Sequence, residues 1–223
     1  MEHRIDASTG ANKDKDTFFN YISVVGLSGD FGTVRLGRTD NTFDIAADPD
    51  AFGGDYFGGR GNRRAGADEK WNNGLMYFTP EMHGFQAVIG TSFSEDAKFE
   101  GTSVDQKNPY ALSILYKNGN LNSALGYMKR ANEDKAVGGS VTYDFGVAKA
   151  FFTAAHNDGK GNGMVVDGGE NGQADGKRTT YDLGVGYWHN LSKRTQLYVT
   201  GNVEKIEGQK TTHAMDMGVV HIF

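Results

Sequence analysis

The chain contains no cysteine. This absence excludes disulfide frameworks, cysteine nucleophiles and thiolate metal sites. Proline is scarce as well, with three in 223 residues, so neither a collagen-like nor a proline-rich disordered chain fits. Long apolar runs are also missing, because no stretch approaches the roughly 18 consecutive apolar residues of a transmembrane helix. A helical membrane protein is therefore excluded, whereas strands that alternate apolar and polar side chains remain able to cross a bilayer.

A surplus of positive charge is absent too. Lysine and arginine number 23 against 28 aspartates and glutamates, which gives a net charge of −5. No net positive field exists to hold a phosphate backbone, so a nucleic-acid partner is not expected. The six histidines are scattered without a His-Glu-x-x-His motif, and no Gly-x-Ser-x-Gly motif occurs. We therefore predict no metal, no cofactor and no enzymatic activity.

Glycine and aromatic residues are abundant. The 32 glycines are about twice the average share of roughly 7%. Aromatic residues make up 12% of the chain, far more than disordered segments contain. The composition thus fits a folded protein with many tight turns.

Apolar side chains recur at every second position from one end of the chain to the other. In segment 109–117, for example, Tyr110, Leu112, Ile114 and Tyr116 alternate with smaller or polar residues. Such strict alternation predicts half-buried strands rather than helices. The predicted strands are 2–8 (the weakest), 17–27, 31–39, 72–79, 84–93, 109–117, 120–129, 136–144, 146–156, 178–188, 195–205 and 213–223.

These strands have the length and the connections of a membrane barrel. Most span roughly 9–11 residues, which crosses a bilayer when the strand is tilted. Short turns alternate with long polar loops at about 40–71, 94–108 and 157–177. This asymmetry is typical of outer-membrane barrels. We therefore predict an all-β protein, an antiparallel transmembrane β-barrel of about 12 strands that forms a single domain over residues 1–223.

The apolar face of the strands admits two interpretations. In a soluble all-β ligand carrier it would face an interior core, whereas in a membrane barrel it would face lipid. Tyr110 and Tyr116 bracket the aliphatic residues of one strand, and Tyr181 and Tyr187 bracket those of another. Tyrosines at both ends of an aliphatic band match the two aromatic girdles of a membrane barrel. The pattern favours the membrane interpretation.

Three segments carry a resemblance to a known family. They are 25–38 (VGLSGDFGTVRLGR), 191–198 (LSKRTQLY) and 217–223 (MGVVHIF). Together, and in this order, they resemble the general porins of Gram-negative outer membranes, in particular those of proteobacteria.

The resemblance implies a passive channel for small hydrophilic solutes and ions. Such porins lie in the Gram-negative outer membrane, as trimers of sixteen-stranded barrels, among outer-membrane lipid and lipopolysaccharide. It also implies that the barrel-assembly machinery reads the C-terminal strand, which ends here at Phe223. A signal peptide is absent from this chain, and we expect it to have been removed or to lie outside the sequence.

The resemblance further implies a pore constriction. A loop as long as 40–71 exceeds the usual limit of about 12–15 residues and is typically functional. In the family this loop folds into the lumen and sets acidic residues against basic residues of the wall. The matching residues are Arg38, Asp48, Asp50, Asp55, Arg60, Arg63, Arg64 and Lys70. We expect a weak charge preference that Arg38→Ala shifts toward cations.

The chain departs from the family in length. The family has three strands before the one that holds 17–27, and this sequence has at most the weak strand 2–8. Two explanations stay open: a compact barrel closed by twelve strands, or a fragment of a longer porin. Two alternative functions also stay open, namely a non-conducting outer-membrane barrel (adhesin, receptor or structural) and the soluble all-β ligand carrier.

Overall fold

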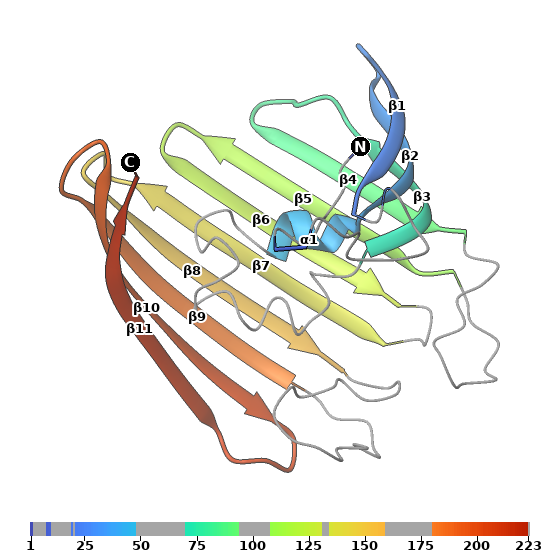
Figure 1. Cartoon of the computed structure of the whole chain (residues 1–223). Coiled ribbons are helices and arrows are strands. Elements are labelled where there is room, and N and C mark those ends of the chain that lie inside the picture. Colours follow the sequence, from blue (N-terminus) through green and yellow to red (C-terminus); the bar gives the residue numbers. More distant parts are fainter. Residues whose placement is uncertain are drawn as a thin grey trace.

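Eleven strands form one continuous antiparallel sheet in sequence order (Figure 1). The computed structural model describes residues 1, 8–9, 19, 21–47, 70–93, 108–130, 134–158 and 180–222. The strands are β1 (Ser23–Gly29), β2 (Gly32–Asp40), β3 (Lys70–Phe78), β4 (Phe85–Ser92), β5 (Tyr110–Asn118), β6 (Leu121–Lys129), β7 (Lys135–Asp144), β8 (Ala148–Asn157), β9 (Thr180–Asn190), β10 (Thr195–Ile206) and β11 (Thr212–His221). A short helix, α1 (Thr42–Ala47), follows β2.

The all-β prediction is confirmed, and eleven of the twelve predicted strands correspond to β1–β11. Most boundaries agree within three residues. The largest difference is in the first of these strands, which was predicted at 17–27 and is observed as β1. Nearly all of the predicted strand 2–8 lies outside the described residues.

The short turns owe their geometry to glycine. The β5–β6 hairpin pairs Asn118 with Leu121, and Gly119 within it has a φ of 54°. The β7–β8 turn contains Gly146 with a φ of 86°. Positive φ angles of this kind cost glycine little, because it has no Cβ. These turns therefore hold adjacent long strands in register at one end of the sheet.

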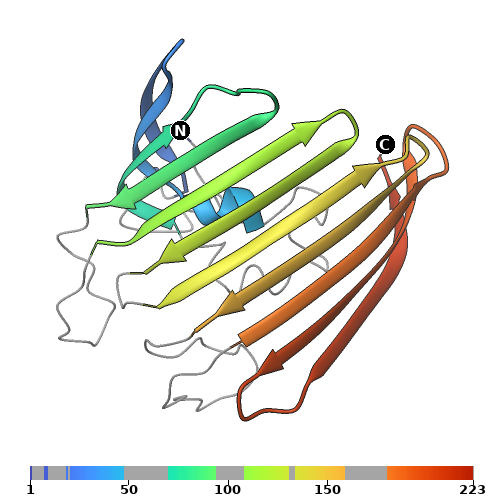
Figure 2. The same ribbon diagram turned by 180° about the vertical axis from the view of Figure 1, so that it is seen from behind.

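The sheet curves so that one face is convex and the other concave, with α1 on the concave side (Figures 1 and 2). Aliphatic side chains lie exposed on the convex face, including Leu112, Ile114 and Val185. Residues of opposite parity on the concave face are mostly small or polar, with a few large apolar side chains such as Met128 and Phe151, and Ser113 and Thr153 are fully buried there. This arrangement matches a membrane barrel. A soluble barrel has the opposite arrangement, with its apolar face inside. The observed arrangement therefore contradicts the soluble carrier.

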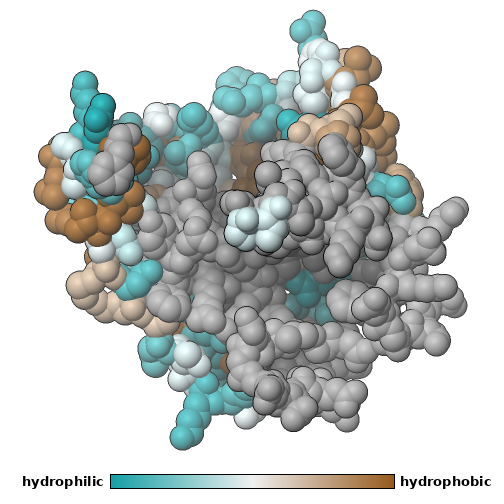
Figure 3. Space-filling view, in the orientation of Figure 1, coloured by the Kyte–Doolittle hydropathy of each residue, from teal (hydrophilic) through white to brown (hydrophobic). Residues whose placement is uncertain are grey.

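The two outermost strands are β1 and β11, and no pairing joins them within the described part of the chain. Apolar residues gather at the two sides of Figure 3, where these strands lie. The sheet is therefore an open arc over the described ranges. None of the described helical residues forms a helix long and apolar enough to cross a membrane.

Candidate functional site

The concave face of the sheet holds α1 against β5, β6 and β7. The anchor is Phe43, whose side chain is completely buried. The ring occupies the space left by neighbours that are mostly small. These neighbours in the buried cluster are Trp71, Ala111, Met128, Ala136 and Ala155. Gly138 also lies beneath the ring. Small residues at these strand positions therefore create the seat on which the helix docks.

Polar contacts fix the start of α1 at the same place. Asn41 caps the helix, because its Oδ1 accepts a hydrogen bond of 3.0 Å from the backbone N–H of Asp44. The Ser113 hydroxyl on β5 donates to the carbonyl oxygen of Thr42 at 2.5 Å. Both Asn41 and Thr42 are fully buried. The chain thus turns inward directly after β2 and is held there by hydrogen bonds as well as packing.

This geometry accounts for the first part of the long loop 40–71. Residues 41–47 lie on the concave face, and Trp71 at the other end of the loop packs in the same cluster as Phe43. The predicted site residues Asp48, Asp50, Asp55, Arg60, Arg63 and Arg64 lie outside the described residues, as does Phe223. Their roles stay predictions.

The two described residues of the predicted constriction lie close to the loop. Arg38 Nη1 donates a 2.5 Å hydrogen bond to Asn72 Oδ1. Lys70 forms an ion pair with Asp40, its partner across the β2–β3 ladder, and its ammonium lies 4.4 Å from the ring centre of Tyr21. The basic side chains therefore end among polar and aromatic groups where β2 and β3 meet the loop.

The face on which Arg38 lies differs from the one expected. Thr39 is buried and contacts Met76, one of the buried side chains of the sheet. Arg38 therefore shares the opposite, convex face with Leu36, because successive side chains of a strand alternate. A bulge in β3 at this point, with Asn73 at a φ of 49°, shifts the register between Gly37 and Thr39, and pairing resumes with Thr39 opposite Trp71. The constriction role of Arg38 stays a prediction, and its position on the sheet argues against it.

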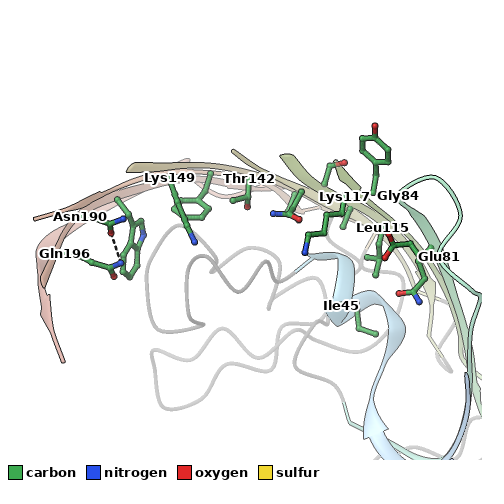
Figure 4. A pocket seen from close by; sticks show the side chains of 17 residues that line it. Ile45, Glu81, Gly84, Leu115, Lys117, Thr142, Lys149, Asn190 and Gln196 are labelled. Atoms are coloured by element: carbon green, nitrogen blue, oxygen red, sulfur yellow. Dashed lines mark hydrogen bonds between the residues drawn. The ribbon is translucent and has the colours of Figure 1, made fainter. Parts of the chain in front are cut away.

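A hollow of about 600 Å³ opens on the concave face, toward the short turns (Figure 4). Lys117 at the end of β5 and Lys149 on β8 both extend into it, together with Thr142 and Gln196. Gln196 donates a 2.8 Å hydrogen bond to Asn190 Oδ1 across β9 and β10. Ile45 of α1 faces the same space. The hollow is lined by polar groups, by the charged side chains of Lys117, Lys149 and Glu81, and by apolar side chains such as Phe151 and Trp188.

Sequence reasoning missed these two lysines as site residues. Lys117 follows Ala111, Ser113 and Leu115 on the side of the strand opposite the tyrosines, so the alternation itself carried the signal. Lys149 has the same parity as Phe151 and Thr153, which are buried on the concave face. It also pairs with Asp144 at 3.5 Å across the β7–β8 hairpin. No cluster of metal-ligating side chains occurs among the residues that the structure describes.

Comparisons with known proteins agree on one family. A family model described as Gram-negative porin matches residues 1–187. Outer membrane porin protein 32 of Delftia acidovorans is 33% identical over 224 residues, which cover 81% of this chain. The chain spans 62% of the length of that relative.

Two further proteins extend the comparison. An outer membrane porin protein of Bordetella pertussis is 26% identical over an alignment that covers 100% of this chain and 77% of the relative. The trimer form of OmpT, an outer-membrane protein of Vibrio cholerae, superimposes with a TM-score of 0.64 at 16% identity, covering 95% of this chain and 68% of the other. The structural likeness shows a shared fold.

Proposed function

Because this chain belongs to the Gram-negative porin family, we propose that it forms a passive diffusion channel for small hydrophilic solutes and ions. The family lies in the outer membrane of Gram-negative bacteria, and this chain lies there with it. The observation that carries the proposal is the arrangement of the sheet, with aliphatic residues exposed on its convex face and mostly small or polar residues on its concave face. A bilayer solvates the first face and water the second.

The helix on the concave face supports a narrowed pore. Phe43 and the Ser113–Thr42 hydrogen bond hold α1 away from the sheet edge and over β5–β7. A segment inside a barrel reduces the cross-section that is open to water. Solutes that keep their hydration or replace it with polar contacts then pass more readily than apolar ones.

The constriction is proposed to include the acidic residues that follow α1. In the sequence Asp48 comes directly after Ala47, the last residue of α1, and α1 lies on the concave side. Asp50 and Asp55 follow, and Arg60, Arg63 and Arg64 supply positive charge to the same loop. Arg38→Ala tests the wall position, because a reversal potential that does not change places Arg38 outside the constriction.

The proposed assembly is a homotrimer of single barrel domains. The support is the trimer form of the Vibrio cholerae protein, whose fold this chain shares. Outer-membrane lipid and lipopolysaccharide are the expected surroundings of the convex face. Recognition of Phe223 by the barrel-assembly machinery is proposed from its place at the end of the alternating C-terminal strand.

The test is single-channel recording of the refolded 223-residue chain in a planar bilayer under a salt gradient. Discrete steps of one stable size are expected, and the reversal potential reports the sign of the charge at the narrowest point. The same preparation after heat denaturation is the control. Absence of steps from a folded, membrane-inserted sample would favour the non-conducting barrel and overturn the channel proposal.

A further inference from the structure

The convex face contains a notch in its aliphatic band. The ladders place Leu125, Gly139, Ala154 and Leu183 side by side across β6, β7, β8 and β9. The two central positions carry a hydrogen and a methyl group, whereas both flanking positions carry leucine. The sheet surface is therefore depressed by most of a side chain at Gly139 and Ala154.

This notch is part of a longer apolar groove of about 640 Å³. Its walls are aliphatic and aromatic, from Ile114, Val137, Val141 and Phe152. At the short-turn end the rings of Phe85 and Tyr116 are 4.4 Å apart. At the long-loop end the rings of His156 and Tyr181 are 4.8 Å apart. Each end of the groove is thus closed by a pair of rings.

The groove follows the axis around which the sheet curves. The row of Tyr116 and the row of His156 are four residues apart along the strands, and β5 and β8 are three strand spacings apart. The step along the strands is about 13 Å and the step across them is about 14 Å. Because the two are perpendicular, the groove is about 19 Å long. In Figure 1 each of the strands β5–β8 runs down and to the right, and each successive strand lies lower and to the left. The step along the strands and the step across them therefore combine into a line that runs downward in this view. In membrane barrels the strands tilt by about 35–45° from the barrel axis, which is parallel to the bilayer normal. A diagonal at a similar angle to the strands therefore runs along the bilayer normal.

One polar atom belongs to the long-loop end of the groove. His156 Nδ1 is buried and has no hydrogen-bond partner among the described residues. Buried polar atoms are nearly always paired, so an unpaired one calls for an explanation. The ring of His156 lines the groove, so a turn of the ring would expose this nitrogen there, and the fitting partner is a polar group close to a lipid headgroup, such as an ester or a hydroxyl.

From these observations we propose that the groove binds one acyl chain of a membrane lipid, with its ester or hydroxyl group at His156. The proposal rests on the membrane placement of the proposed function and adds a specific lipid site to it. Direction, length and chemistry all fit, because acyl chains lie along the bilayer normal and one leaflet supplies about 15 Å of hydrocarbon. A sheet of a second subunit would instead meet the surface broadly, across the strands.

The test is photolabelling of the full chain in phosphatidylcholine vesicles that contain a small fraction of phosphatidylcholine with a diazirine in its acyl chain. After irradiation, labelled peptides are quantified by mass spectrometry. Labelling at Leu125, Ala154 and Phe152 is expected to exceed that at the convex-face residues Leu197 and Val199 of β10 several-fold. Equal labelling of both regions would overturn the proposal, as would protein–protein cross-links at the groove in place of lipid adducts.

Ala154→Phe fills the notch and is expected to lower groove labelling about threefold, to the level of β10. Ala154 is chosen because a Cβ at Gly139 would lie 2.7 Å from the Ala124 carbonyl oxygen, too close for a side chain at that position to fit without a shift of the backbone. Val199→Phe, on the same face but outside the groove, is the matched control and should leave groove labelling unchanged. His156→Leu should reduce labelling of the groove, because it removes the ring nitrogen that would bind the lipid ester or hydroxyl while it leaves an apolar side chain in the wall of the groove. Unchanged labelling in Ala154→Phe would refute the site, whatever conductance the channel shows.

Discussion

The ring of Phe43 lies against Gly138, and a Cβ built on that glycine would be 2.9 Å from Phe43 Cζ. This single contact joins the loop helix to the middle of the sheet. Real Cβ atoms avoid so close an approach, so glycine at this position is required by the aromatic ring above it. The contact thus decides whether α1 can remain docked on the concave face.

Gly138→Ala is expected to weaken the docking of α1 by about 1–3 kcal/mol, because an added methyl overpacks a filled site. The free energy of unfolding in urea measures the loss. In a Phe43→Ala background the same substitution should cost much less, since the ring has gone. Gly201→Ala is the control, because its Cβ would meet nothing closer than 3.9 Å. Equal costs in both backgrounds would show that the ring does not enforce the glycine.

Phe43→Ala alone is expected to raise single-channel conductance. Removing a fully buried aromatic ring costs about 3–5 kcal/mol, enough to release a helix of six residues from the sheet. A released segment blocks the pore less on average and makes the current noisier. Phe145→Ala, at an exposed turn position, should change neither conductance nor noise. A conductance that falls in Phe43→Ala would contradict a narrowing role for α1.

The strands could be predicted because their signal is local and repeated. Period-2 alternation over nine or more residues, as in β5, places each side chain on one face without knowledge of its neighbours. Helix α1 could not be predicted in this way, since its six residues span less than two turns and its anchor Phe43 packs on strands that come much later in the chain. Its stability comes from Phe43 and Ser113, which are contacts across the fold.

The candidate site was harder to predict because the family resemblance matches positions along the chain and does not say on which face of the sheet a side chain lies. The family resemblance suggested a wall role for Arg38, yet its neighbour Thr39 faces Met76 and puts Arg38 on the other side of the sheet. Lys149, by contrast, has the parity of the buried Phe151 and Thr153 and reaches the concave face. The polar face of the strands therefore identifies wall charges better than position at a strand end.

Asn41→Ala is expected to loosen the start of α1 by about 1 kcal/mol, because the N–H of Asp44 loses its cap. Trp71 packs in the same cluster as Phe43 and reports the change. In a Trp188→Phe background its fluorescence should shift to longer wavelength as water reaches the ring. Asn41→Asp keeps an accepting oxygen and should stay close to the parent. A shift of equal size in both variants would mean that the cap does not hold the helix.

Lys149→Glu is expected to move the reversal potential toward cations. The side chain extends into the concave hollow, and the substitution replaces a positive charge with a negative one on that wall. Fixed charges next to a narrow aqueous path act on ions that pass within a Debye length of about 8–10 Å. Asp144→Asn removes the carboxylate that pairs with Lys149 at 3.5 Å, so it should move the potential in the opposite direction.

The matched control for Lys149→Glu is Lys193→Glu, in the exposed turn between β9 and β10 at the same end of the sheet. It introduces the same change in net charge without altering the hollow. A smaller shift in this control shows that selectivity depends on where the charge lies, because net charge alone acts on both variants equally. If the two variants shift the potential by the same amount, the path of the ions does not pass Lys149, and the cationic wall lies elsewhere.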